Sequence, residues 1–157
     1  MRVGHGYDAH TFIAGRPLIL GGVTIPHDRG LLAHSDGDAV IHALCDSLLG
    51  AVALGDIGTF FPDTDSTYKN IDSRILLRQV MTIIRNKGFR VGNVDITILA
   101  QAPKIMPYTL EMKSNLAADL GVETSDVNIK ATTTEGMGFV GRKEGIAVYA
   151  TVLIIKL

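Results

Sequence analysis

The sequence has one cysteine, almost no net charge and no long hydrophobic run, and each shortage excludes a class of protein. Cys45 is the only cysteine, so the chain cannot form an internal disulfide, which is typical of a reducing compartment. The 15 lysines and arginines and 16 aspartates and glutamates leave a net charge of −1, which gives no general reason to expect nucleic-acid or membrane binding. No apolar run approaches the length of a membrane span, and the first residues lack the apolar core of a signal peptide. We therefore expect a cytoplasmic protein with no membrane and no nucleic-acid partner.

Length and composition indicate one globular domain over residues 1–157. The sequence is 46% hydrophobic and 20% charged, and it has neither an internal repeat nor a low-complexity tract. A chain of this length can bury about two-thirds of its unfolded surface. Cys45 lies in an apolar helical pattern, so we interpret it as a packed core residue rather than a nucleophile.

Hydrophobic spacing and turn residues predict the secondary structure. Gly21-Gly22 joins two short apolar runs and indicates a hairpin, because such turns need a positive φ. We predict strands at residues 2–10, 17–20, 23–25, 89–100, 127–131 and 145–157, helices at 38–54, 73–87 and 107–120, and irregular segments at 26–36 and 56–65. This order implies an α+β domain with a mixed β-sheet and helices packed on one face.

Three residues near the N-terminus predict a metal site. Asp8 and His10 are two residues apart, so on a strand both side chains project from the same face, and His42 would join them from a neighbouring helix. Imidazole nitrogens and carboxylate oxygens are zinc ligands, and three protein ligands leave a fourth position open for substrate. Any one of these histidines is more often structural, but the combination predicts a zinc site.

A polar stripe runs along the first predicted helix, where Asp38, His42 and Asp46 recur at four-residue spacing. Asp38 is one of three residues that could cap this helix, and Gly55 suits its end. The rest of the helix is apolar, which indicates that it is mostly buried. A polar stripe in that setting needs partners, such as a metal, a substrate or another subunit.

Several loops carry ion-binding chemistry. Thr132-Thr-Thr-Glu135 directly follows a strand; its hydroxyls and N–H groups could hold phosphate oxygens, while Glu135 could hold a bridging divalent ion. Lys104 and Arg142 are further anion candidates, and the Asp56–Asp65 segment could bind a cation or polyol hydroxyls. Taken alone, each pattern is more typical of a β-forming run, an exposed cation or a solvated turn. If the strands before Lys104 and Thr132 point the same way, their ends meet at one edge of the sheet.

No residue has the surroundings of an activated nucleophile, since His34 and Ser35 are only adjacent in sequence. The chain also lacks the G-x-x-x-x-G-K-[ST] motif and a G-x-G-x-x-G motif after a strand, which excludes nucleotide binding by those devices. A metal ion with anion-binding loops suits a reaction in which the substrate supplies its own nucleophile. Phosphoryl transfer fits that description, because positioning and charge neutralisation do most of the work.

Six short motifs run in order along the whole chain: Gly4-His-Gly-Tyr-Asp-Ala-His10, His34-Ser-Asp-Gly-Asp38, Gly55-Asp-Ile-Gly58, Phe61-Pro-Asp-Thr-Asp65, Ala100-Gln-Ala-Pro-Lys104 and Lys130-Ala-Thr-Thr-Thr-Glu135. Together they resemble the 2-C-methyl-D-erythritol 2,4-cyclodiphosphate synthase family, and the resemblance implies a chorismate-mutase-like β-α-β-α-β-β arrangement. That family converts 4-diphosphocytidyl-2-C-methyl-D-erythritol 2-phosphate to the cyclic diphosphate and releases CMP, a step in non-mevalonate isoprenoid synthesis.

The resemblance implies a role for each motif. It puts zinc on Asp8, His10 and His42, with a substrate phosphate oxygen in the fourth position, and a magnesium or manganese ion at Glu135. It puts His34 close to the transition state and has Thr133 orient the phosphates, so these two are the expected catalytic residues. The implied contacts to the phosphate and erythritol part are Asp8, His10, His34 and Ser35, and those of the erythritol pocket are Asp56, Ile57, Gly58, Phe61, Pro62, Asp63, Thr64 and Asp65. Cytosine and ribose would contact Ala100, Gln101, Ala102, Pro103, Lys104, Ile105 and Met106, and the diphosphate would contact Thr132, Thr133, Thr134 and Glu135. Phe139 and Arg142 are two further implied ligand contacts.

The resemblance also implies a homotrimer with active sites between subunits, the zinc side from one chain and the cytidine side from its neighbour. In a chain without tryptophan, some of the hydrophobic residues would then face other subunits. Family members have an apolar cavity on the three-fold axis that can hold an isoprenoid diphosphate, and Phe139 and Arg142 match its mouth. Gly136-Met-Gly138 and Val140 depart from the family pattern near this cavity and leave the zinc ligands unaffected.

Two other functions are compatible with the same residues. A zinc-dependent phosphohydrolase would share the metal but use water as the nucleophile. A non-catalytic trimer could bind isoprenoid diphosphates as a sensor. The products distinguish these hypotheses, because only the cyclising lyase yields a cyclic diphosphate with CMP.

Overall fold

The computed structural model describes residues 1–157 and contains seven strands and five α-helices. The strands are β1 (Arg2–Ile13), β2 (Leu18–Leu20), β3 (Val23–Ile25), β4 (Gly30–Leu31), β5 (Phe89–Leu99), β6 (Val127–Thr132) and β7 (Gly145–Lys156). The helices are α1 (Ala39–Ala51), α2 (Ile57–Phe60), α3 (Ser73–Asn86), α4 (Thr109–Leu120) and α5 (Gly138–Gly141), with 3₁₀ turns η1 (Ser66–Tyr68), η2 (Met106–Tyr108) and η3 (Thr124–Asp126). None of the helices is both long enough and apolar enough to cross a membrane.

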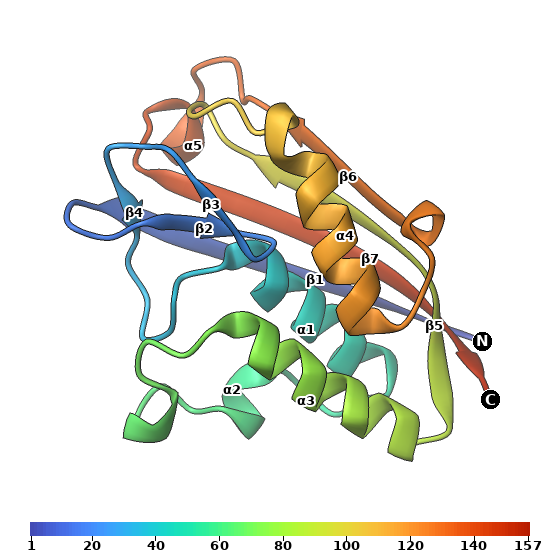
Figure 1. Cartoon of the computed structure of the whole chain (residues 1–157). Helices are drawn as coiled ribbons and strands as arrows, with labels where there is room; N and C mark the ends of the chain where they lie inside the picture. Colours follow the sequence, from blue (N-terminus) through green and yellow to red (C-terminus); the bar gives the residue numbers. More distant parts are fainter.

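Five strands form one mixed sheet in the order β4-β1-β7-β5-β6, and β2 and β3 form a separate hairpin (Figure 1). β1 pairs antiparallel with β4 and β7, and β7 pairs antiparallel with β5. β5 and β6 are parallel, with Leu99 opposite Thr132, so both strands end at the same edge. The prediction of an α+β fold with a mixed sheet is therefore confirmed.

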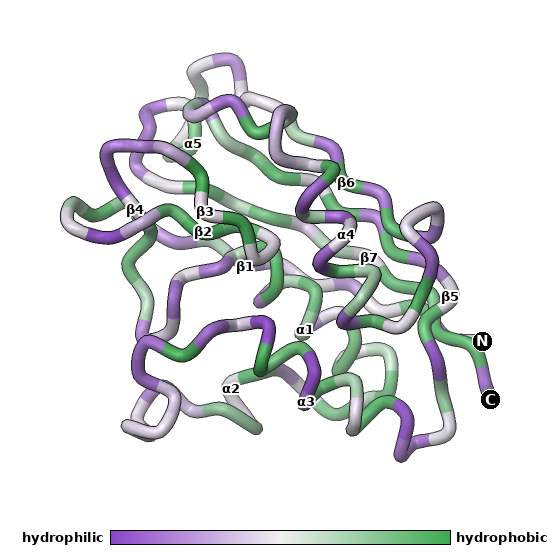
Figure 2. Tube along the Cα trace, in the orientation of Figure 1, coloured by the Kyte–Doolittle hydropathy of each residue, from purple (hydrophilic) through white to green (hydrophobic).

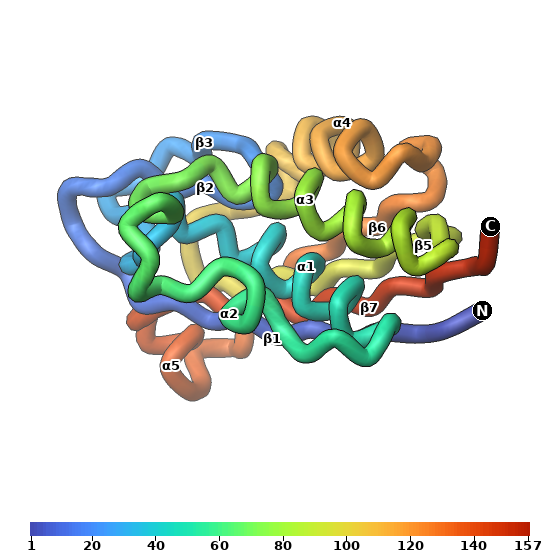
Figure 3. Tube along the Cα trace, turned by 90° about the horizontal axis from the view of Figure 1, so that it is seen from below, coloured from blue at the N-terminus to red at the C-terminus, as the bar shows by residue number.

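Three long helices cover one face of the sheet. Figure 3 shows α1, α3 and α4 on this side and the short α5 on the other. α1 lies against β1 and β7, and the hydrophobic residues of β7 and α1 occupy the middle of the molecule (Figure 2). The buried apolar side chains of the strands, of α1 and of the inner sides of α3 and α4 form one core, which contains Cys45. The expectation of helices on one face holds for the three long helices, whereas α5 is an exception.

Two glycines of β1 let α1 approach the sheet closely. A Cβ added to Gly6 would lie 2.0 Å from the Ala43 carbonyl oxygen, and one added to Gly4 would lie 1.8 Å from the Ser47 carbonyl oxygen. Any side chain at either position would therefore push α1 away from β1. Because Asp8 and His10 lie on β1 and His42 lies on α1, these glycines also set the distance across the predicted metal site.

The opposite face of the sheet carries exposed apolar and aromatic side chains that no long helix covers. Tyr149 of β7 packs against His5 and Tyr7 of β1, with ring centroids 5.8 and 5.0 Å away. Val3, Tyr7 and Tyr149 remain 67%, 45% and 41% exposed. This face, formed by β1, β7 and β5, is called the outer sheet face below.

The structure corrects several predicted boundaries. The first helix ends at Ala51 rather than near Leu54, because Ala53 adopts a φ of 60° in place of a glycine. The Ala53 and Leu54 N–H groups then donate to the carbonyls of Gly50 and Leu49, which satisfies the helix end. Two segments predicted as irregular contain regular structure: β4 lies within 26–36, and α2 lies within 56–65. α2 forms because the Asp56 carboxylate accepts a hydrogen bond from the Thr59 N–H at its start.

Candidate active site

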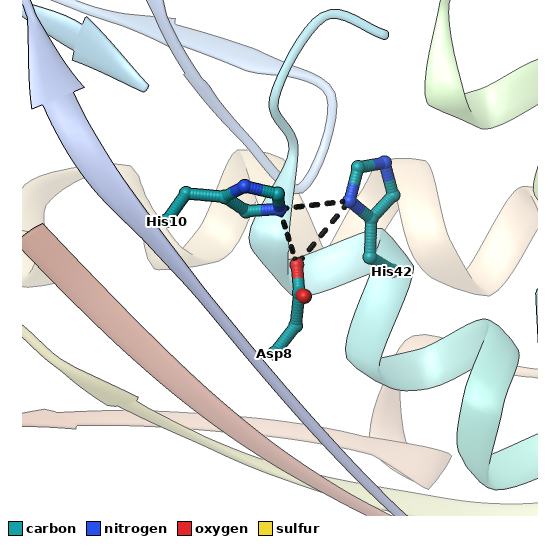
Figure 4. A group of neighbouring side chains, drawn as sticks. All are labelled: Asp8, His10 and His42. Atoms are coloured by element: carbon teal, nitrogen blue, oxygen red, sulfur yellow. Dashed lines mark hydrogen bonds and ion pairs between the residues drawn. The ribbon is translucent and has the colours of Figure 1, made fainter. Parts of the chain in front are cut away.

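Asp8, His10 and His42 meet at the contact between β1 and α1 (Figure 4). Asp8 Oδ2 lies 2.7 Å from His10 Nε2 and 3.2 Å from His42 Nδ1, and these two ring nitrogens are 3.3 Å apart. Asp8 and His10 project from the same face of β1, and His42 comes from the first turn of α1. The strand period and the predicted helix thus bring these side chains together as the sequence indicated.

The donor atoms are zinc ligands, and two of their three separations match the geometry of a zinc site. In a tetrahedral site with bonds of about 2.0–2.1 Å, neighbouring ligand atoms lie roughly 3.3 Å apart. His10 Nδ1 donates to the Leu32 carbonyl oxygen at 3.1 Å, so its Nε2 presents a lone pair to the Asp8 carboxylate only 2.7 Å away. Two acceptors at that distance need either a proton or a metal cation between them or beside them. The triad therefore offers three converging ligand atoms that can hold a metal ion when the imidazoles are neutral.

The electrostatics of the triad also favour positive charge. Burial raises the pKa of Asp8, but hydrogen bonds and charge from His10 and His42 outweigh it and lower the pKa below its usual value. Burial lowers the pKa of His42, but the hydrogen bond and charge of Asp8, with help from Asp38 and Asp36, raise it overall. A site that stabilises a carboxylate and a charged imidazole together is suited to binding a cation.

A cavity of about 480 Å³ opens beside the triad. Its lining includes eight of the residues that sequence analysis named as substrate contacts outside the triad: His34, Ser35, Ile57, Gly58, Phe61, Pro62, Asp63 and Thr64. His34 Nε2 donates to the Asp65 carbonyl oxygen at 2.9 Å, so the two loops that line the cavity are joined to each other. The cavity is therefore built from β1, α1, the loop at residues 33–35, the 56–65 segment and the residues that lead into α3.

Two predicted acidic contacts act as helix caps. Asp56 caps α2, and its carboxylate accepts from the Thr59 N–H and hydroxyl, both at 3.2 Å. Asp65 accepts from the Thr67 N–H at 2.9 Å, and this hydrogen bond lowers the pKa of Asp65 below its usual value. Neither side chain lines the cavity, although both shape the loops that do.

The polar stripe on α1 has three different sets of partners. Asp38 is fully buried and accepts from the N–H groups of Gly21, Gly22 and Ile41 at 2.7–3.1 Å, so it caps α1 and holds the β2–β3 turn. Burial raises the pKa of Asp38 to about 6. Asp46 accepts from the Ile57 N–H at 2.8 Å and so fixes the start of α2. Only His42 of the stripe lines the cavity.

A second group of predicted residues lies at the edge where β5 and β6 end together. The Ala100 N–H donates to the Thr132 carbonyl oxygen at 3.0 Å, and Gln101 Oε1 accepts from the Gly136 N–H at 3.2 Å. The loops 100–106 and 132–135 are thus neighbours, as expected from parallel strands. No residue of either loop lines the cavity beside the triad, so Lys104 and Glu135 of one chain are not part of that cavity.

Phe139 and Arg142 lie near the outer sheet face. Phe139 lines a pocket of about 140 Å³ together with Tyr7, Thr134, Tyr149 and other residues. Arg142 is exposed and forms an ion pair with Glu144 at 2.8 Å, outside this pocket. The two residues that matched the mouth of the family cavity therefore differ in their surroundings within one chain.

Sequence reasoning missed residues that contact the site from α3 and the segment before it. Ser73 Oγ lies 2.9 Å from His42 Nε2, and Tyr68, Ile71 and Leu76 line the cavity. Ser73 is 31 residues from His42 in sequence, and a serine at a helix start is ordinarily read as a cap. Nothing in the local sequence signals its contact with the histidine.

Comparison with known proteins places the chain in a family over nearly its whole length. Residues 1–155 match the YgbB family. Relatives named 2-C-methyl-D-erythritol 2,4-cyclodiphosphate synthase include a Proteus mirabilis protein, 61% identical over 99% of this chain and 98% of its own length. An Ectopseudomonas mendocina protein of the same name is 63% identical, covering 99% of each chain.

Solved structures agree with the sequence comparison. A Plasmodium falciparum IspF in complex with CDP superposes with a TM-score of 0.87 at 37% identity, covering 99% of this chain and 96% of that one. The bifunctional IspDF of Campylobacter jejuni gives a TM-score of 0.96 at 47% identity over 99% of this chain, which spans 42% of that longer protein. The chain therefore belongs to the YgbB family, whose curated relatives described above carry the name 2-C-methyl-D-erythritol 2,4-cyclodiphosphate synthase.

Proposed function

We propose that the protein converts 4-diphosphocytidyl-2-C-methyl-D-erythritol 2-phosphate to 2-C-methyl-D-erythritol 2,4-cyclodiphosphate and releases CMP, within non-mevalonate isoprenoid synthesis. It is then a metal-dependent phosphorus–oxygen lyase of the cytoplasm, with residues 1–157 as a single catalytic domain. The observation that carries this proposal is the Asp8–His10–His42 triad in the wall of a 480 Å³ cavity, in a chain of the YgbB family.

The chain's own residues position the substrate beside the metal. When bound, zinc on the triad and magnesium or manganese at Glu135 would neutralise phosphate oxygens as the 2-phosphate attacks the β-phosphorus. His34 Nε2 donates to the Asp65 carbonyl oxygen, which fixes the ring and leaves Nδ1 without a partner in the chain, so Nδ1 can donate to a substrate phosphate oxygen when it is protonated. CMP leaves as a stable phosphate, so no strong general acid is needed. Holding the two phosphates close in a folded-back conformation supplies much of the acceleration.

We further propose that the active site forms between subunits of a homotrimer. Two observations support this. The cavity beside the triad has no residue from loops 100–106 and 132–135, which are the expected cytidine and diphosphate contacts. The outer sheet face exposes Val3, Tyr7 and Tyr149 to solvent, and subunit contacts would bury them. A neighbouring chain would then supply Lys104 and Thr133 to the cavity.

The pocket beside Phe139 suits an apolar ligand on the three-fold axis of such a trimer. Seven of its nine lining residues are hydrophobic, and the exposed guanidinium of Arg142 lies on the same short segment as Phe139. An isoprenoid diphosphate combines an apolar chain with an anionic head, so it is the ligand class we propose there. The glycines of Gly136-Met-Gly138 leave this segment with few side chains for such a contact.

Phosphorus NMR of the purified protein with the cytidyl substrate, zinc and magnesium tests the activity. We expect CMP and a pair of coupled signals from a cyclic diphosphate, and we expect His42→Ala to abolish both. His27→Ala is a matched control, because the His27 ring packs at a tilt against Phe12 and does not line the cavity. Linear hydrolysis products would instead indicate a zinc-dependent phosphohydrolase. No turnover, with isoprenoid diphosphate binding that survives His42→Ala, would indicate a non-catalytic binding protein.

A further inference from the structure

Ser73 is a completely buried polar residue behind the metal-binding triad. It occupies the first position of α3, and its Oγ lies 2.9 Å from His42 Nε2. The same hydroxyl donates to Asp36 Oδ1 at 2.5 Å, and the Ser73 backbone N–H donates to Asp36 Oδ2 at 3.0 Å. Hydrogen bonds therefore connect the start of α3, the loop before α1 and the buried histidine of the triad.

The direction of each hydrogen bond follows from the donors available. Asp36 is a carboxylate that accepts two hydrogen bonds from Ser73 and one from the Asp38 N–H at 3.1 Å. The Ser73 proton is committed to Asp36, so Ser73 Oγ can only accept from His42. The neutral, metal-binding form of His42 must therefore carry its proton on Nε2, which leaves a lone pair on Nδ1 directed at Asp8 and His10.

We propose that Ser73 and Asp36 are positioning residues that hold His42 in its metal-binding tautomer and orientation. The inference rests on the proposed metal site and adds two residues to it. Imidazole ligands commonly donate their second N–H to a carboxylate, which fixes the ring and strengthens its metal bond. Here a buried serine stands between the histidine and the carboxylate, and it transmits the same constraint.

Ser35 contacts the same nitrogen but has a different role. Its Oγ lies 3.1 Å from His42 Nε2 and accepts from the Gly37 N–H at 3.3 Å, and it has no other hydrogen-bond partner in the chain. Its own proton is therefore free to reach a substrate oxygen in the cavity that Ser35 lines. Ser73 is the closer acceptor and is tied to a carboxylate, so it dominates the orientation of His42. Ser35 remains a second acceptor when Ser73 is removed.

The zinc dissociation constant of the purified full-length protein, measured by competition with a chromogenic chelator, tests this proposal. We expect Ser73→Ala to weaken zinc binding about tenfold and the Ser35→Ala/Ser73→Ala double variant about a hundredfold. Asp36→Asn should also weaken it about tenfold, because an amide cannot accept both Ser73 hydrogen bonds. Ser47→Ala is the matched control: Ser47 is equally buried on α1, but its hydroxyl donates to the Leu44 carbonyl oxygen. Asp72→Asn is the control for Asp36, because Asp72 caps the same helix without touching His42.

The melting temperatures of the metal-free variants separate positioning from general damage. We expect Ser73→Ala and Ser47→Ala to lose similar stability, with zinc affinity lost only in the first. Wild-type zinc affinity in the double variant would overturn the proposal, and so would an equal loss of affinity in Ser47→Ala. Because zinc binding is measured without substrate, a protein that binds zinc but yields no cyclic diphosphate would contradict the proposed function and not this inference.

Discussion

Replacing Gly6 with alanine should separate α1 from β1 and break the metal site. The new Cβ would lie 2.0 Å from the Ala43 carbonyl oxygen, about 1.4 Å inside the 3.4 Å at which ordinary contact begins. The obstacle is helix backbone, which cannot rotate away as a side chain can. We expect a loss of about 3 kcal/mol in the free energy of unfolding, the upper end of what overpacking usually costs. Because zinc ligands tolerate displacements of only about 0.2 Å, moving His42 with α1 should also abolish tight zinc binding.

Gly50→Ala is the matched control for this substitution. A Cβ at Gly50 would have only the His5 carbonyl oxygen nearby, at 3.9 Å, and Gly50 is an exposed helical residue. Alanine there should raise the free energy of unfolding by about 0.5–1 kcal/mol through its lower unfolded-state entropy. Urea denaturation and metal analysis of both variants check the pair. A Gly6→Ala protein with wild-type stability and full zinc content would refute the inference that the metal site depends on the close contact of α1 with β1 at Gly6.

Three further predictions concern acidic residues. Asp8→Ala should remove zinc from the purified protein and abolish turnover while leaving assembly intact; full zinc occupancy by metal analysis would exclude Asp8 as a ligand. Asp46→Ala should raise KM for the cytidyl substrate about fivefold through loss of the hydrogen bond to Ile57, and Asp46→Asn, which keeps an acceptor, should restore it. Asp38 has a pKa of about 6 in the folded protein, against an ordinary value of 3.8. Its protonation therefore adds about 3 kcal/mol to the free energy of unfolding below pH 4, and this contribution is lost as the pH rises through 6. The difference in unfolding free energy between wild type and Asp38→Asn should therefore change by that amount between pH 4 and 7, and a constant difference would contradict the buried pKa.

Local periodicity was sufficient to predict the metal triad. Asp8 and His10 needed only a strand, and His42 needed only a helix that packs on it. The mixed sheet followed from the same patterns, because the long strands alternate buried and more exposed residues and α3 has a clear apolar face. Loops 100–106 and 132–135 were predicted to meet if the strands before them were parallel. β5 and β6 are parallel, so the two loops are neighbours.

Features that depend on tertiary packing were not predictable from local sequence. Asp38 and Asp46 look alike on the helical stripe, yet one holds the β2–β3 turn and the other holds α2. The end of α1 was misplaced because Ala53 adopts the left-handed conformation that Gly55 was expected to supply. Ser73 reaches His42 only because α3 packs beside α1. The roles of the individual substrate contacts remain predictions, since they depend on a bound substrate and on a neighbouring chain.

The separation of the triad cavity from loops 100–106 and 132–135 has a consequence for mixtures of inactive proteins. Under the proposed function, His42→Ala would damage only the zinc side of a site, and Lys104→Ala would damage only the cytidine side. If neighbouring chains supply the two sides, trimers reassembled from both variants contain some sites with two intact halves. Random reassembly of equal amounts should restore about a quarter of the sites, although neither variant alone has one. Each active site would thus need residues from two neighbouring chains, and two defective subunits could complement each other.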